Sequence, residues 1–175
     1  HEDLEATVAT LKTLLETQDA VILSGGVSVG DHDQIKPALK CLGIEPELWR
    51  VKVKPGKPFL FARSEGSPSC FLFGLPGNPV SSFVTYQLFV RPALLRWMGA
   101  KEVLPLAVPV RLNAALRNEG DRPHYLRGVV HEGCFAMQGL QQSHALFALS
   151  QANALLRLEP GADLPAGSMA EALLL

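Results

Sequence analysis

The chain has 175 residues, 47% of them hydrophobic, and its 16 basic and 17 acidic side chains give a formal net charge of −1. This balance argues against nucleic-acid binding, which normally comes with a basic excess, and no apolar run approaches the ~20 residues that span a bilayer. The three cysteines lack the spacing of a disulfide framework or a zinc site, so we expect a globular cytoplasmic protein of up to two small domains.

The first predicted element is a helix over residues 4–15, where Leu4, Val8, Leu11 and Leu15 recur at helical spacing. Such a stripe is typical of a crossover helix that follows earlier strands of the same sheet. Because the chain also begins at His1 and not at a methionine, we expect a fragment. Its sheet would lack its first strands and leave an exposed edge, or a site that a partner chain completes.

A glycine-rich loop, SGGVSVGDHD at residues 24–33, follows a short apolar strand predicted at 20–23. Glycines let backbone N–H groups approach a ligand closely. Beyond the loop a helix is predicted over 35–42, and Gly43 stops it. Asp33 therefore has two interpretations: it caps this helix, or it holds Mg²⁺, a hard cation that prefers carboxylate and phosphate oxygens.

The next motif is KPGKP at residues 54–58. Two prolines restrict the backbone around Gly56 and hold Lys54 and Lys57 in one short loop. Two fixed ammonium groups suit a phosphate or another oxyanion, which predicts an anion site. The alternative is that these lysines are solvated charges at a strand edge.

A third motif, GLPGNPVS at residues 74–81, overlaps the end of a buried strand predicted at 71–75. Asn78 is the expected N-cap and Pro79 the first residue of a helix that runs to Trp97, so free N–H groups at the helix start would attract an anion. An ordinary strand-to-helix turn is the alternative. Pro92 should kink this helix or end its first half.

The alternation of helices and strands up to residue 98 predicts an open α/β sheet, with ligand loops at the carboxyl ends of its strands. Residues 99–104 form the predicted linker. Beyond it, a small β-barrel domain over 105–175 is predicted from five short strands. These strands are expected at 106–112, 125–130, 135–138, 154–158 and 169–174.

The three motifs, in this order and spacing, resemble the molybdopterin molybdenumtransferases, the family of bacterial MoeA and of the E domain of gephyrin. The stretch RPHYLRG at 122–128 and the segments around Ser143 and at 150–153 are more loosely similar to the family's C-terminal barrel. The resemblance implies an N-terminally incomplete, MogA-like pterin-binding domain at 1–98, followed by the barrel. Full-length members carry two additional N-terminal domains.

The resemblance implies an enzyme of molybdenum cofactor biosynthesis. It would insert molybdate into adenylylated molybdopterin and release AMP with the help of Mg²⁺, mainly by electrostatic stabilisation. Asp33 matches a catalytic or Mg²⁺-binding carboxylate, and Lys54 and Lys57 match catalytic lysines for molybdate and pyrophosphate. The implied cofactor-binding residues are Ser24, Gly25, Gly26, Ser28 and Gly30 in the loop, Gly77, Asn78 and Ser81 in the turn, and Arg122, Arg127 and Ser143 in the barrel.

The resemblance also implies a homodimer whose cleft takes residues from both chains, and a molybdopterin adenylyltransferase or molybdoenzymes as further partners. Two other functions stay open. One is a molybdopterin adenylyltransferase, although that family normally lacks both the barrel and KPGKP. The other is a pterin-binding or scaffold fragment without turnover, in the way that gephyrin's E domain also serves as a receptor scaffold.

Overall fold

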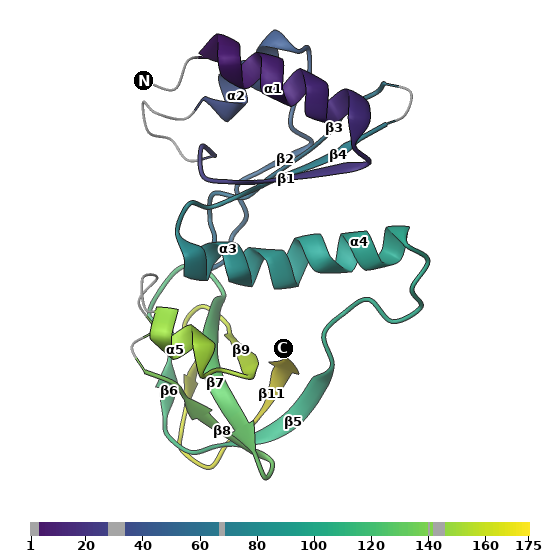
Figure 1. Cartoon of the computed structure of the whole chain (residues 1–175). Helices are drawn as coiled ribbons and strands as arrows, with labels where there is room; N and C mark the ends of the chain where they lie inside the picture. Colours follow the sequence, from purple (N-terminus) through teal and green to yellow (C-terminus); the bar gives the residue numbers. More distant parts are fainter. Residues whose placement is uncertain (1–3, 28–33, 67–68, 140, 142–145) are drawn as a thin grey trace. The chain divides into compact units, whose positions relative to one another are not determined.

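The computed structural model describes residues 4–27, 34–66, 69–139, 141 and 146–175 (Figure 1). The chain divides into two compact units, one of residues 1–51 and 56–78 and the other of 52–55 and 79–175. No helix in the described part of the chain is long and apolar enough to cross a membrane.

The first unit is a four-stranded sheet with two helices over the same face (Figure 1). The strand order is β1-β4-β3-β2; β1 and β4 run parallel, whereas β3 is antiparallel to both of its neighbours. The elements are α1 (Leu4–Thr17), β1 (Ala20–Ser24), α2 (Ile35–Cys41), β2 (Leu48–Trp49), β3 (Leu60–Arg63) and β4 (Phe71–Leu75). The predicted alternation of helices and strands and the predicted α/β class are confirmed.

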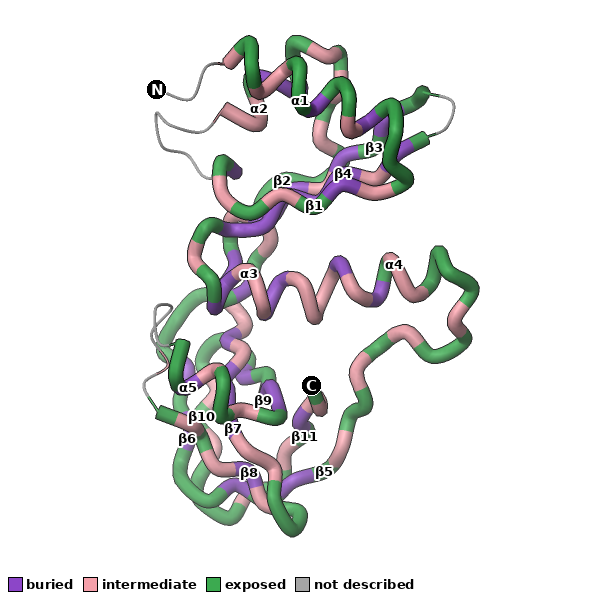
Figure 2. The backbone as a smooth tube through the Cα atoms, viewed as in Figure 1, coloured by how far each residue is buried: buried purple, intermediate pink, exposed green. Residues whose placement is uncertain are grey.

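The core of this unit lies between the sheet and the two helices (Figure 2). The predicted stripe on α1 buries Leu11 and Leu15, and α2 adds Leu39, which is fully buried. Burial of one apolar face is what stabilises such helices in a globular protein. The N-cap position of α2 is Gln34, whereas the sequence pointed to Asp33, which lies outside the described residues.

The second unit contains a closed barrel with the strand order β11-β5-β8-β7-β9, which confirms the predicted barrel. Its strands are β5 (Ala107–Leu112), β7 (His124–His131), β8 (Cys134–Met137), β9 (Ala154–Leu158) and β11 (Met169–Leu174). Apolar side chains from all five strands fill it, and closure leaves no free sheet edge. Three short elements were not predicted from the sequence: the paired strands β6 (Leu116–Arg117) and β10 (Asp163–Leu164), and the helix α5 (Leu146–Ser150).

A long helical run also belongs to the second unit: α3 (Pro79–Thr85), a π-helical turn η1 (Tyr86–Val90) and α4 (Arg91–Trp97). It begins at Pro79 and ends at Trp97, as predicted. Pro92 lies in the first turn of α4, directly after the π-helical turn. A wider turn relieves the clash between a proline ring and the preceding turn, so the run continues in three segments. The sequence placed this run in one domain with the sheet, and the predicted domain limits stay a prediction.

Candidate functional site

Two predicted glycine segments meet at the carboxyl edge of the parallel strands in the first unit. Ser24 pairs with Leu75, and the Gly25 N–H donates to the Leu75 carbonyl at 3.0 Å, one residue beyond the strand. A Cβ added to Gly77 would lie 3.5 Å from the Gly25 Cα, so the two loops are in close contact. The structure thus brings Ser24, Gly25 and Gly77 together.

This geometry changes the expected role of Gly25. Its N–H group is already bonded to Leu75 and is not available to an anion, while its φ of 92° shows why glycine stands there. Ser24 and Gly26 are exposed, and Gly26 also has a positive φ of 68°. The loop's remaining predicted residues, Ser28, Gly30 and Asp33, lie outside the described residues.

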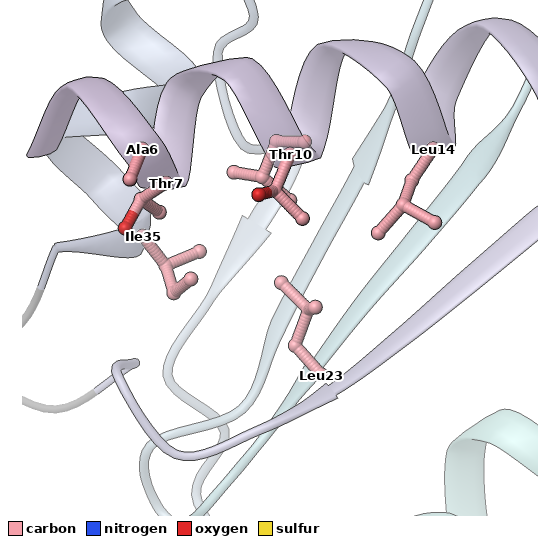
Figure 3. A pocket seen from close by; sticks show the side chains of 7 residues that line it. Ala6, Thr7, Thr10, Leu14, Leu23 and Ile35 are labelled. Atoms are coloured by element: carbon pink, nitrogen blue, oxygen red, sulfur yellow. The ribbon is translucent and has the colours of Figure 1, made fainter. Parts of the chain in front are cut away.

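An apolar pocket of about 320 Å³ lies between α1, the end of β1 and the start of α2 (Figure 3). Figure 3 shows Leu23 and Ile35 directed toward the helix that carries Thr7, Thr10 and Leu14. The lining has no charged side chain, so it does not suit an anionic group. The sequence did not predict this pocket, because the partial burial of Leu14 becomes visible only in the structure.

Lys57 lies in the first unit, on the connection from β2 to β3. Its carbonyl accepts hydrogen bonds from the N–H groups of Val51 and Phe59, both at 3.0 Å. Gly56 has a φ of 122°, a conformation that disfavours any other residue. The Lys57 side chain is exposed and belongs to none of the ion pairs among the described residues. A fixed backbone therefore carries an ammonium group that points into solvent.

Lys54 belongs to the second unit, where its backbone joins the start of β7. Its N–H donates to the Pro123 carbonyl at 2.9 Å, and its carbonyl accepts from the Tyr125 N–H at 2.8 Å. These bonds make a parallel bridge between Lys54 and His124. Directly paired residues present their side chains on the same side, so Lys54 and His124 share a face. The sequence predicted neither this pairing nor any role for His124.

Arg122 is held beside this bridge by a buried asparagine. One Arg122 guanidinium nitrogen donates to the Val53 carbonyl at 3.3 Å. The amide of Asn118, only 3% exposed, donates to the Arg122 and Leu158 carbonyls and accepts from the Gly120 N–H. Asn118 thereby orders the turn that carries Arg122. This role of Asn118 was not predicted from the sequence, although Asn followed two residues later by Gly is a common turn signal.

Arg127 is 1% exposed and lies on β7. The Gln141 side chain accepts from its N–H at 2.8 Å and donates to its carbonyl at 3.0 Å. Burial lowers the pKa of the guanidinium from its usual value. Arginine keeps its charge in proteins, so Arg127 adds a buried positive charge to this strand.

Burial lowers the pKa of His124 to about 4, and the charges of Lys54, Arg127 and Arg122 add to the effect. His124 is therefore neutral at neutral pH. The charges of these three cations therefore act on one neutral imidazole. Asp121, which contacts Arg122 at 3.4 Å, is 90% exposed and balances this charge weakly. Such a group attracts an oxyanion.

The other predicted residues are placed as follows. Ser81 is buried in the first turn of α3, and Asn78 is the last residue before the second unit's helix. Ser143 lies outside the described residues. Within the described ranges no three His, Cys, Asp or Glu side chains are grouped to hold a metal, so the predicted Mg²⁺ finds no complete protein site there.

Comparisons with known proteins give matches over both parts of the chain. Residues 1–96 match the family model of a probable molybdopterin binding domain, and residues 109–175 match that of the MoeA C-terminal region, domain IV. A MoeA protein of known structure from Pyrococcus horikoshii aligns with 99% of this chain and 41% of its own length, at a TM-score of 0.80 and 25% identity.

Three curated relatives have a higher sequence identity to this chain than the MoeA structure has. A molybdopterin molybdenumtransferase from Nostoc sp. is 37% identical over 87% of this chain and 36% of its own length. The molybdenum cofactor synthesis protein cinnamon of Drosophila melanogaster is 37% identical over 90% of this chain and 26% of its own length. Gephyrin of Dictyostelium discoideum is 36% identical over 99% of this chain and 28% of its own length. The chain thus spans about a third of the length of these relatives.

Proposed function

The chain belongs to the molybdopterin molybdenumtransferase family of MoeA and gephyrin, and from this we propose that it inserts molybdate into adenylylated molybdopterin and releases AMP. Every ligand of that reaction is an anion. A site for it must therefore gather positive charge and hydrogen-bond donors.

The observation that carries this proposal is the cationic group at the start of β7. The charges of Lys54, Arg122 and Arg127 all lie close enough to His124 to lower its pKa, and backbone bonds to residues 123 and 125 hold Lys54 at the start of this strand. Fixed charges of this kind bind an oxyanion without reorganising, and they stabilise the negative charge that grows on a leaving phosphate. In the first unit, Lys57 would bind molybdate or pyrophosphate, and Gly77 and Asn78 would bind near the pterin phosphate. No protein nucleophile is needed.

Mg²⁺ is part of the proposal through Asp33 alone. A bound Mg²⁺ would neutralise phosphate charge, and its other ligands would be substrate oxygens and water. We expect Asp33→Asn to remove the dependence of AMP release on Mg²⁺ and to leave urea unfolding unchanged, because the N-cap of α2 is Gln34. A variant that unfolds more easily yet keeps its Mg²⁺ dependence would assign Asp33 a structural role only.

The second candidate is a pterin-binding or scaffold fragment without turnover. The observation in its favour is that the chain spans only about a third of its relatives' length. A molybdopterin adenylyltransferase is disfavoured, because that family normally lacks the barrel and the KPGKP motif that this chain contains. A homodimer, adenylyltransferase or molybdoenzyme partners and a cytoplasmic location complete the proposal and rest on the resemblance.

The decisive experiment measures AMP release from adenylylated molybdopterin by the purified chain, with and without molybdate and Mg²⁺. We expect Lys57→Ala to lower molybdate-dependent release roughly a hundredfold, as for other lost transition-state contacts. The free energy of unfolding should change by less than about 0.5 kcal/mol, because an exposed loop lysine packs little. Lys101→Ala, an exposed lysine near the end of α4, is the matched control.

Two results would count against this function. If the folded wild-type chain binds pterin but releases no AMP, it is a binding fragment. If Lys57→Ala loses stability in proportion to its activity, Lys57 is structural and the anion hypothesis for its loop is wrong.

A further inference from the structure

A cluster of cations surrounds an exposed tryptophan at the outer strand of the first unit's sheet. The Trp49 patch is defined by Trp49 and Arg50 at the end of β2 and by Lys36 on α2, together with Lys40, which follows Lys36 by about one helical turn. The Lys36 Nζ lies 3.7 Å from the Trp49 ring centroid, and the Arg50 Cζ lies 4.2 Å from it. Both distances are within cation–π range, yet the tryptophan remains 40% exposed. None of these residues belongs to the anion site described above.

The backbone of Arg50 is held in an unfavourable conformation. Its φ is 64°, in the left-handed region that favours glycine. Two hydrogen bonds keep this turn in place: the Arg50 N–H donates to Phe59 at 2.8 Å, and the Val51 N–H donates to Lys57 at 3.0 Å. The turn ends β2 and brings the guanidinium back over the ring of the preceding residue. Strained residues of this kind cluster at binding and switch sites.

Within the described residues, no acidic side chain forms an ion pair with a cation of the patch. Lys36 and Lys40 are four residues apart on α2, where like charges destabilise a helix, and the α2 sequence IKPALKC contains no acid. Glu47, next to β2, pairs instead with Arg63 at 3.3 Å. None of the patch cations belongs to an ion pair among the described residues, although the whole chain has a net charge of −1. An external anion would offset this repulsion.

We propose that the Trp49 patch is a docking site for an acidic, extended peptide segment of a partner protein. The cations are spread over about one helical turn, roughly 6 Å, and the end of β2, which matches several separate carboxylates better than one compact anion. The tryptophan edge offers apolar contact. Because β2 is last in the strand order, its outer edge has no partner strand among the described residues, and an extended segment can lie along it. This docking does not depend on the proposed reaction.

The test is a fluorescence anisotropy titration of the whole chain with a labelled peptide of alternating Asp and Leu. We expect binding that weakens with added salt, and that Arg50→Glu weakens roughly tenfold or more, because an attractive contact becomes a repulsive one. Lys12→Glu makes the same charge change on an exposed lysine of α1, outside the patch, and should leave the affinity unchanged. Equal losses in both variants, or no binding by the wild-type chain, would overturn the proposal.

A second variant separates binding from folding. Arg50→Gly removes the cation and suits a positive φ, so the fold should keep its stability while peptide affinity falls. Unchanged affinity in this variant would make the turn merely structural. Two competition results also contradict the proposal: inorganic phosphate displacing the peptide fully would indicate a small-anion site, and self-association lost in Arg50→Glu would indicate an interface between copies of the chain.

Discussion

The pH dependence of stability is expected to carry a signature of His124. In the unfolded chain this imidazole titrates near its usual pKa of about 6.5, whereas in the folded chain the pKa is about 4. Between these values only the unfolded state binds the proton, so stability is full above about pH 6.5 and falls as the pH drops toward 4. This pKa difference of about 2.5 units corresponds to at most about 3–4 kcal/mol of stability.

This prediction is tested by urea unfolding of the wild-type chain and His124→Asn between neutral and mildly acidic pH. The wild-type chain should lose more stability than the variant over this range. His131→Asn, at the exposed end of the same strand, is the control and should follow the wild-type curve. Parallel curves for the wild-type chain and His124→Asn would contradict the buried, neutral histidine.

The residues of the candidate site differ in how far the sequence could predict them. Lys54 and Lys57 stand out because prolines flank them, and the structure fixes the backbone of each. The pairing of Lys54 with His124 depends on a bridge between segments far apart in the chain, for which the local pattern holds no signal. For Gly25 the local pattern was informative but incomplete. Glycines predict that the backbone can come close to a neighbouring group, but not that the Gly25 N–H donates to the Leu75 carbonyl.

Among the elements, β7 and β8 meet at a position that tolerates only glycine. A Cβ on Gly128 would overlap the ring of Phe135 and would lie 2.6 Å from the carbonyl oxygen of Ala136. We expect Gly128→Ala to lower the free energy of unfolding by about 1–3 kcal/mol, since the barrel must shift to accept the methyl group. Urea unfolding measures the loss.

A double variant tests the cause of that loss. Phe135→Leu removes the ring that the new methyl group meets, although it costs stability by itself because Phe135 is 1% exposed. In combination with Gly128→Ala the total loss should be smaller than the sum of the two single losses. Additive losses would mean that the strain at Gly128 comes from the backbone alone.

The predictability of the elements follows their length and periodicity. The strands β4, β9 and β11 have the predicted limits, because each is a run of five or six residues bounded by turn residues. The pair β6 and β10 has two residues per strand, too few for any alternation to appear. The π-helical turn η1 was also missed, because its wider ring depends on how the helix accommodates Pro92 and leaves no mark in the apolar spacing.

At the scale of the whole molecule, one stretch of the second unit concentrates exposed apolar surface. Trp97, Met98, Leu104 and Leu106 are 49%, 78%, 73% and 66% exposed, and they lie within the end of α4 and the segment that leads to β5. Exposed apolar side chains gathered in this way mark contact surfaces. The proposed homodimer therefore has a candidate contact that can be tested.

We expect the chain to self-associate through this stretch, and the double variant Met98→Glu with Leu104→Glu to weaken association roughly a hundredfold or more. Burying each side chain contributes about 1.5–3 kcal/mol, and a buried glutamate adds a desolvation cost. Sedimentation velocity over a concentration series gives the dissociation constants. Phe147→Glu, on the equally exposed face of α5, is the control and should associate like the wild-type chain. If the wild-type chain stays monomeric throughout, or if Phe147→Glu alone dissociates it, this stretch is not the contact, and the homodimer needs another surface.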